Sequence, residues 1–226
     1  HSPRLVDLGL GAASGLAAGV ALWAIYQAFV LTSVGVAAPI TAVVSGVIPV
    51  ILDSVTGSPP SRLAATGIVM GMASLILAAW SPGTADLNRG IALAAFAGLA
   101  FAAMLLLGAE TSAESGLWPL VAQRSVAGAL VAAAGLALGN ELLPRDTSVK
   151  RTAAIGGVFG TLGVGAIYIG FQRATTATVG AVAVAGSMYP AVTVALRWVF
   201  DGERLRWWQV VGLAGSLVGV ALIAGG

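Results

Sequence analysis

The stretch LGLGAASGLAAGVALWAIYQAFVL, residues 8–31, contains no ionised side chain. A run of about 20 apolar residues is long enough to cross the hydrocarbon core of a bilayer as an α-helix. Its apolar residues do not alternate strictly with polar ones, as they would in a strand of a membrane β-barrel. Because the backbone must satisfy its own hydrogen bonds in lipid, the stretch predicts a transmembrane helix.

Seven further stretches share these properties, and only Arg124 interrupts one of them. Prolines, turn-forming residues and charges gather in short connections between the stretches, such as residues 141–151. The seven stretches are residues 33–52, 63–80, 90–109, 117–139, 152–172, 174–196 and 207–226. The sequence therefore predicts an all-α, polytopic membrane helix bundle with eight transmembrane helices.

The composition excludes several classes of protein. Of the 226 residues, 58% are hydrophobic and only 9% are charged, whereas soluble domains carry about 25% charged residues. A soluble enzyme, a nucleic-acid binder and a disordered regulator are therefore excluded. The chain has no cysteine and one histidine, at position 1. Because it offers no thiolate site and no histidine cluster, we expect no metal and no cofactor.

An internal repeat relates the two ends of the chain. An offset of 145 residues places Gly11 on Gly156 and Gln27 on Gln172. The offset contains five predicted spans. Because five is an odd number, the two copies must cross the membrane in opposite senses, as in an inverted repeat.

The repeat divides the chain into two predicted domains. Residues 1–80 would be the last three helices of a first repeat, and residues 81–226 a complete second repeat of five helices. The first two helices of the second repeat would have counterparts before residue 1. We therefore expect ten helices in two inverted five-helix repeats, of which this chain holds eight.

Residues 187–225 resemble the end of an EamA-type repeat. They contain Tyr189-Pro190, then Asp201-Gly202-Glu203-Arg204, then a closing helix with regularly spaced glycines. The first copy departs from this pattern, because Gly57-Ser58-Pro59 stands where the family shows Gly-Glu-Arg. EamA proteins belong to the drug/metabolite transporter superfamily. The resemblance implies ten helices in two inverted halves and the export of amino acids and other metabolites.

Aromatic and amide side chains lie at nearly matching places in the two copies. Spacings of three and four residues put each set on one helix face. Aromatic walls with an amide suit an amphipathic organic solute, although tyrosine and tryptophan near helix ends also form interfacial belts. The two sets are Trp23, Tyr26 and Gln27, and Tyr168, Phe171 and Gln172.

Two prolines, Pro49 and Pro190, lie inside apolar stretches. Proline kinks a helix, and bent helices often line midplane sites in transporters. Ser187, Tyr189 and Thr193 surround Pro190 and offer hydrogen bonds to a substrate, or return them to their own backbone. We expect the helices that carry the prolines and the aromatic-amide sets to enclose a central polar pocket.

Arg124 is the only charge well inside a predicted span. Such a group usually faces a cavity or a partner, but an interfacial arginine beside Gln123 and Trp118 is the alternative. Glu110 is either its partner, a proton carrier or a helix-end carboxylate in water. The predicted substrate-binding residues are Trp23, Tyr26, Gln27, Arg124, Tyr168, Gln172, Ser187, Tyr189, Pro190 and Thr193.

Glycines spaced by three or four residues recur in both copies. Such stripes let helices approach closely, or form a flexible seam between moving parts. They fall at residues 11, 15 and 19, at 67 and 71, at 156 and 160, and at 212, 215 and 219.

These features predict a secondary transporter that exports small organic metabolites, such as amino acids or related solutes, by alternating access. No Gly-x-x-x-x-Gly-Lys-Ser/Thr motif for ATP occurs, so a gradient would supply the energy. The alternatives are a non-transporting membrane assembly or regulatory protein and a lipid-acting membrane enzyme. The sequence gives such an enzyme no nucleophile or paired in-membrane carboxylates.

The expected partners are a small-molecule substrate and the lipid bilayer, without nucleic acid, for a monomer or homodimer. The expected location is the inner (plasma) membrane of a bacterium. Basic residues are more numerous on the side opposite the termini, which favours termini outside the cell. The family resemblance implies a cytoplasmic C-terminus, and we follow the family for Gly226.

Overall fold

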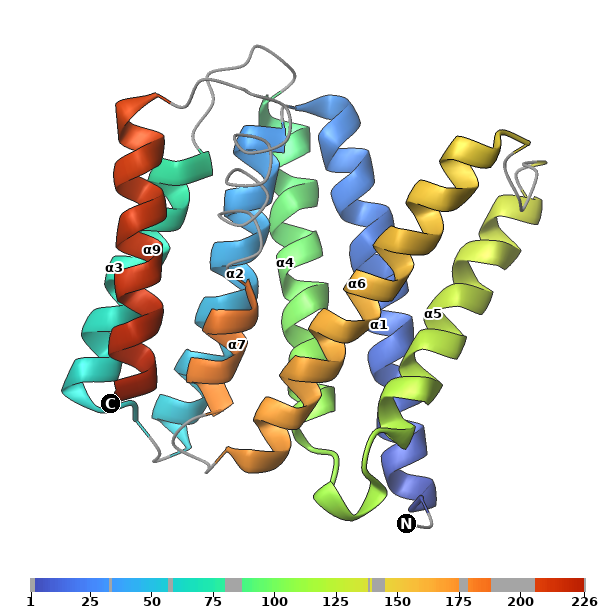
Figure 1. Ribbon diagram of the computed structural model, residues 1–226, viewed down its shortest axis with the longest axis horizontal. Coiled ribbons are helices and arrows are strands. Elements are labelled where there is room, and N and C mark those ends of the chain that lie inside the picture. The colour runs from blue at the N-terminus through green and yellow to red at the C-terminus, as the bar shows by residue number, and fades with distance from the viewer. Residues whose placement is uncertain are drawn as a thin grey trace. The chain divides into compact units, whose positions relative to one another are not determined.

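Every regular element in the described part of the chain is helical (Figure 1). The computed structural model describes residues 3–32, 34–56, 59–79, 87–137, 139, 145–174, 179–187 and 206–225. The helices are α1 (Leu5–Leu31), α2 (Val34–Val55), α3 (Arg62–Ala79), α4 (Leu87–Ala109), the short η1 (Ala113–Ser115), α5 (Trp118–Ala137), α6 (Thr147–Arg173), α7 (Val179–Ser187) and α9 (Trp207–Gly225). Each α-helix overlaps one of the eight predicted stretches, and the predicted all-α membrane bundle is confirmed.

Four of the described helices are long and apolar enough to cross a membrane. They are α1, α5, α6 and residues Arg89–Ala109 of α4, and a shorter apolar helix covers Ile40–Val55. Of the predicted stretch 174–196, the structure describes α7, and the rest lies outside the described residues apart from Ala174. The chain is a multi-pass membrane protein.

The α6 helix begins earlier than hydropathy predicts. Residues 147–151 were expected in a connection, but they form the first turns of α6. Asp146 precedes the helix and accepts a hydrogen bond of 2.7 Å from the backbone N–H of Ser148, as an N-cap residue does. This bond holds the pKa of the Asp146 carboxyl below its usual value. Hydropathy does not detect the start of a helix whose first turns are polar, even when an N-cap residue stabilises that start.

Spatial contacts divide the chain into two compact units. Unit 1 consists of His1–Gly19 and Ala103–Arg173, and unit 2 of Val20–Ala102 and Ala174–Gly226. The α1 and α4 helices contribute residues to both units, so each unit combines segments that are distant in the sequence.

In unit 1, glycines let α1 approach α5 closely. A Cβ atom at Gly15 would lie 2.5 Å from the carbonyl oxygen of Gln123. One at Gly11 would clash with the backbone of Pro119, and one at Gly19 with Leu130. The close packing predicted for this stripe is therefore confirmed.

In unit 2, α3 and α9 pack along their glycine faces, and Figure 1 shows them side by side. A Cβ atom at Gly219 would lie 2.8 Å from Cα of Gly71 and 2.9 Å from the carbonyl oxygen of Gly67. One at Gly215 would clash with the Ser74 side chain. The predicted role of these stripes in packing is also confirmed.

Small apolar residues build the rest of unit 2. Ala24 and Ala28 of α1 and Ala94 and Ala97 of α4 are fully buried in one cluster. A second cluster joins α2, α3 and α7 through Val47, Ile68, Met72 and Val184. The α2 helix continues through Pro49, whose side chain is fully buried.

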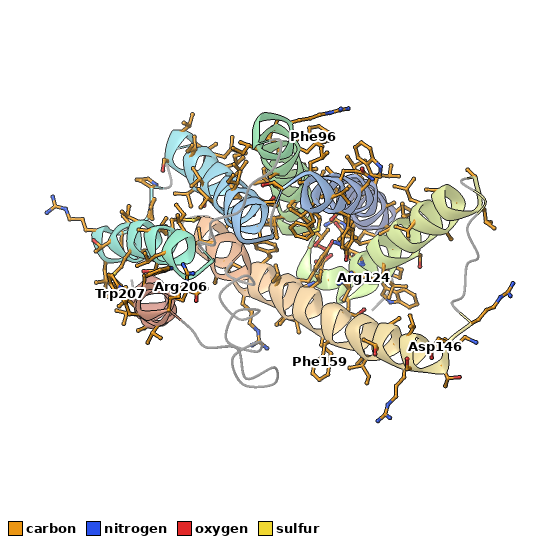
Figure 2. All side chains as sticks on the ribbon, turned by 90° about the horizontal axis from the view of Figure 1, so that it is seen from above. Phe96, Arg124, Asp146, Phe159, Arg206 and Trp207 are labelled. Carbon is orange, nitrogen blue, oxygen red and sulfur yellow. The ribbon has the colours of Figure 1, made fainter. Side chains whose placement is uncertain are left out.

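The glycine stripe of α6 differs from its counterpart in α1. A Cβ atom at Gly156 or Gly160 would meet nothing within 4 Å among the described residues. The neighbouring Phe159 is 70% exposed, and Figure 2 shows it projecting away from α6. The prediction of helix packing at this stripe has no counterpart in the described structure.

Candidate functional site

Three helices of unit 1 bring polar side chains together. Tyr168 of α6 is 2% exposed, and its hydroxyl donates a long hydrogen bond of 3.4 Å to Oγ of Ser14 in α1. Nε2 of Gln123 in α5 donates to the same oxygen at 3.3 Å. Ser14 in turn donates to the carbonyl oxygen of Met104 at 2.9 Å. We call Ser14, Gln123 and Tyr168 the polar cluster.

The polar cluster retains hydrogen-bonding capacity. Gln123 is only 1% exposed, and its Oε1 atom is buried without a hydrogen-bond partner. Buried polar atoms in folded proteins are nearly always partnered. The unpartnered oxygen is therefore an acceptor whose hydrogen bond is not made within the described residues.

Arg124 follows Gln123 in α5 and reaches toward α6. Its Nη2 atom donates to the carbonyl oxygen of Gly160 at 2.5 Å, and its Nε atom is buried without a partner. Arg124 is labelled in Figure 2. Glu110 is exposed at the end of α4, and within the described residues no ion pair of Arg124 occurs. The Gly160 carbonyl is therefore the partner that the described residues provide for this cation, as is common for charges in membrane spans.

Gln172, one helical turn beyond Tyr168, fixes the connection between η1 and α5. Its Nε2 atom donates to the carbonyl oxygen of Gly116 at 2.6 Å. Gly116 has φ of 53° and ψ of −129°, a conformation that is costly for any residue with a side chain. Gln172 therefore supports the start of the helix that carries Gln123 and Arg124, and Phe171 beside it is buried.

The aromatic-amide set of the first copy has different surroundings from the set of the second copy. Trp23 is 58% exposed and Tyr26 is 62% exposed, and Gln27 is exposed as well. Tyr26 packs edge-on against Phe29 with ring centroids 6.0 Å apart. The two sets that the sequence presents as equivalent thus occupy an exposed face in unit 2 and a buried cluster in unit 1.

Comparison with known proteins decides the family. The EamA-like transporter family matches residues 88–225, which is more than half of the chain. This chain belongs to the EamA-like transporter family. It is therefore a membrane transporter of the drug/metabolite transporter superfamily.

Solved structures support the fold of this EamA-like transporter. One crystal structure of a protein matches with a TM-score of 0.65 at 17% identity. The match covers 96% of this chain and 85% of that chain. No curated protein matches the transporter.

Four predicted site residues of the transporter lie wholly, or with their side chains, outside the described structure. Ser187 ends α7, but its side chain is outside the described structure. Tyr189, Pro190 and Thr193 lie outside the described residues. The predicted central pocket that includes them stays a prediction.

Sequence reasoning missed two members of the polar cluster. Gln123 was interpreted as a residue suited to the membrane interface, but it is buried, and Ser14 was not singled out. A polar side chain inside an apolar span is a signal that could have found both, because such groups usually bond across helices.

Proposed function

We propose that this transporter is a secondary transporter that exports small organic metabolites, such as amino acids or related solutes, by alternating access across a bacterial inner (plasma) membrane. The observation that carries the proposal is the pair of adjacent residues Gln123 and Arg124. Gln123 has a buried acceptor without a partner, and Arg124 has a buried donor without a partner. An amino acid carries a donor, its ammonium group, and an acceptor, its carboxylate.

The surroundings of the pair support an organic solute. The Tyr168 ring contributes an aromatic surface beside Ser14 and Gln123, and aromatic lining with a few polar groups is common in small-molecule sites. In inverted-repeat transporters, substrate sites lie near the bilayer midplane. Arg124 is the seventh residue of α5, well inside a helix of membrane-spanning length.

The test is efflux from proteoliposomes that contain the purified protein and labelled amino acids of acidic, neutral and aromatic type. We expect saturable efflux for one of these groups. Arg124→Gln should raise KM by roughly tenfold or more, because a hydrogen bond to a charged group contributes about 1.5–3 kcal/mol. Gln123→Leu should also raise KM.

Arg151→Gln is the matched control, because Arg151 is an exposed arginine on the first turns of α6. It should leave KM unchanged. Folded protein that gives no saturable efflux for any amino acid would contradict the proposed substrate class. Equal KM values for Arg124→Gln and the wild type would contradict the proposed site.

A further inference from the structure

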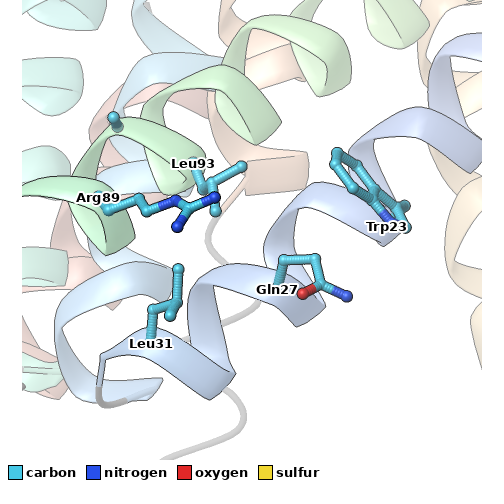
Figure 3. Close-up of a pocket in the computed structure, with 6 residues that line it drawn as sticks. Trp23, Gln27, Leu31, Arg89 and Leu93 are labelled. Atoms are coloured by element: carbon cyan, nitrogen blue, oxygen red, sulfur yellow. The ribbon is translucent and has the colours of Figure 1, made fainter. Parts of the chain in front are cut away.

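A groove lies between α1 and α4 within unit 2 (Figure 3). Its volume is about 480 Å³, and it is open to the outside of the unit. Trp23, Gln27 and Leu31 line it from α1, and Arg89, Ala92 and Leu93 line it from α4. Spacings of three and four residues place each trio on one helix face. The groove is thus built on two rigid helices and contains one cationic side chain.

The groove runs from the ends of the two helices toward their interiors. α1 ends at Leu31, and α4 begins at Leu87, two residues before Arg89. With a rise of 1.5 Å per residue, Trp23 lies about 12 Å from Leu31 along the axis of α1, toward the interior of the helix. Both helices are of membrane-spanning length. The Arg89 end of the groove therefore lies near the headgroup level of the bilayer, and the Trp23 end lies within the hydrocarbon region.

The surface around the groove is apolar and exposed. Val30 is 80% exposed, Tyr26 62% and Phe96 46%. In a membrane protein, such side chains suit contact with lipid chains and with the interfacial region. Arg89 is exposed, and the described part of the chain provides no ion pair for it. The charge that complements this groove is negative, and the surface that complements its walls is a hydrocarbon chain.

We propose that the groove binds an anionic phospholipid of the surrounding bilayer. The phosphate group pairs with the Arg89 guanidinium, and the Gln27 amide donates a hydrogen bond to the headgroup. One acyl chain lies along Leu93, Ala92 and the Trp23 indole. A basic site between helices at headgroup level is the kind that recognises anionic lipids. This inference does not depend on the proposed substrate, and it assigns Trp23 and Gln27 to lipid.

The experiment measures lipid binding to the purified protein in detergent by native mass spectrometry and by the midpoint of thermal unfolding. The probes are dioleoyl phosphatidylglycerol and dioleoyl phosphatidylcholine, which share acyl chains and differ in net charge. We expect phosphatidylglycerol to bind more tightly and to raise the midpoint more. In Arg89→Gln, phosphatidylglycerol should bind about fivefold more weakly, which is the effect of one cation near an anionic headgroup. Gln27→Leu should weaken binding without a change in charge.

Arg62→Gln is the matched control, because Arg62 is an exposed arginine at the start of α3. It should keep the wild-type preference for phosphatidylglycerol. Equal binding of the two lipids by the wild type, or an unchanged preference in Arg89→Gln, would overturn the proposal. The proposal would also be overturned if soluble glycerol phosphate raised the midpoint of thermal unfolding as much as phosphatidylglycerol does, because the ligand would then be a free anion. Conversion of a dimer to a monomer by Arg89→Gln would instead show that the groove joins two copies of the chain.

Discussion

The Asp7 carboxylate accepts a hydrogen bond of 2.5 Å from Oγ of Ser115, across 108 residues of sequence. Ser112 donates two more bonds to the same carboxylate, from its Oγ at 2.9 Å and its backbone N–H at 3.3 Å. Asp7 is only 3% exposed. The first turn of α1 is therefore fastened to the connection between α4 and α5, inside unit 1. A carboxylate in the first turn also interacts favourably with the helix dipole.

Asp7→Ala should destabilise the protein strongly. The substitution leaves the donors of Ser112 and Ser115 without their acceptor, and unsatisfied buried donors cost about 1–3 kcal/mol each. We expect the free energy of unfolding to fall by about 3 kcal/mol, seen as a lower midpoint of thermal unfolding in detergent. Glu114→Gln, an exposed acid on η1, is the control and should leave the midpoint unchanged. A midpoint for Asp7→Ala equal to that of the control would show that the contact contributes little.

Gly219→Ala should destabilise the α3–α9 pair although alanine forms helices better than glycine. The added Cβ would lie 2.8 Å from Cα of Gly71, so the two helices would have to separate. Gly128→Ala in α5 is the control, because a Cβ there meets nothing within 4 Å. The control should be neutral or stabilising by up to about 1 kcal/mol. Thermal unfolding of both variants measures the difference. An opposite ranking of the two midpoints would refute close packing at Gly219.

Asp53→Ala should loosen the first turn of α7. Oδ2 of Asp53, in the last turn of α2, accepts a hydrogen bond of 2.6 Å from the backbone N–H of Gly180. An acceptor at a helix N-terminus contributes about 1 kcal/mol, so amide exchange at Gly180 should become about fivefold faster. Ser54→Ala is the control, since its hydroxyl donates within its own helix to the carbonyl oxygen of Val50. Unchanged exchange in Asp53→Ala would mean that the cap is dispensable.

The helix positions could be predicted from hydropathy, because only a helix satisfies the backbone of a long apolar stretch in lipid. The start of α6 at Thr147 could not, because its first turn is polar and is fixed by the cap at Asp146. The glycine stripes predicted close packing, but not which helix each stripe meets. That depends on the tertiary arrangement: a Cβ at Gly15 would clash with Gln123, whereas one at Gly160 would meet nothing within 4 Å among the described residues.

The candidate site could be predicted only in part. Arg124 and Tyr168 stand out as polar groups in apolar spans, and the structure places both in unit 1. The contact of the Asp7 carboxylate could not be predicted from the sequence, because its serine partners lie more than 100 residues away. Trp23 follows the same spacing rule as Tyr168, yet it is exposed. Spacing shows which residues share a helix face, but the neighbouring helices decide whether that face is buried.

The last prediction concerns the orientation of the chain, for which charge and family disagree. With the eight predicted spans, both termini would lie on one side of the membrane. Arg145, in the connection before α6, and Lys150 and Arg151, in the first turns of α6, would lie on the other side, and this more basic side would be cytoplasmic by the positive-inside rule. The family resemblance implies a cytoplasmic C-terminus instead. We follow the family resemblance and predict that Gly226 faces the cytoplasm.

A reporter that is active only in the cytoplasm, fused after Gly226, measures this orientation. We expect activity from that fusion. The matched control carries the same reporter after Asp146, in a connection predicted to lie on the opposite side of the membrane. It should be silent at equal expression on an immunoblot. The reverse pattern, an active reporter after Asp146 and a silent one after Gly226, would show that the basic residues near the start of α6 determine the orientation and that the family analogy does not extend to it.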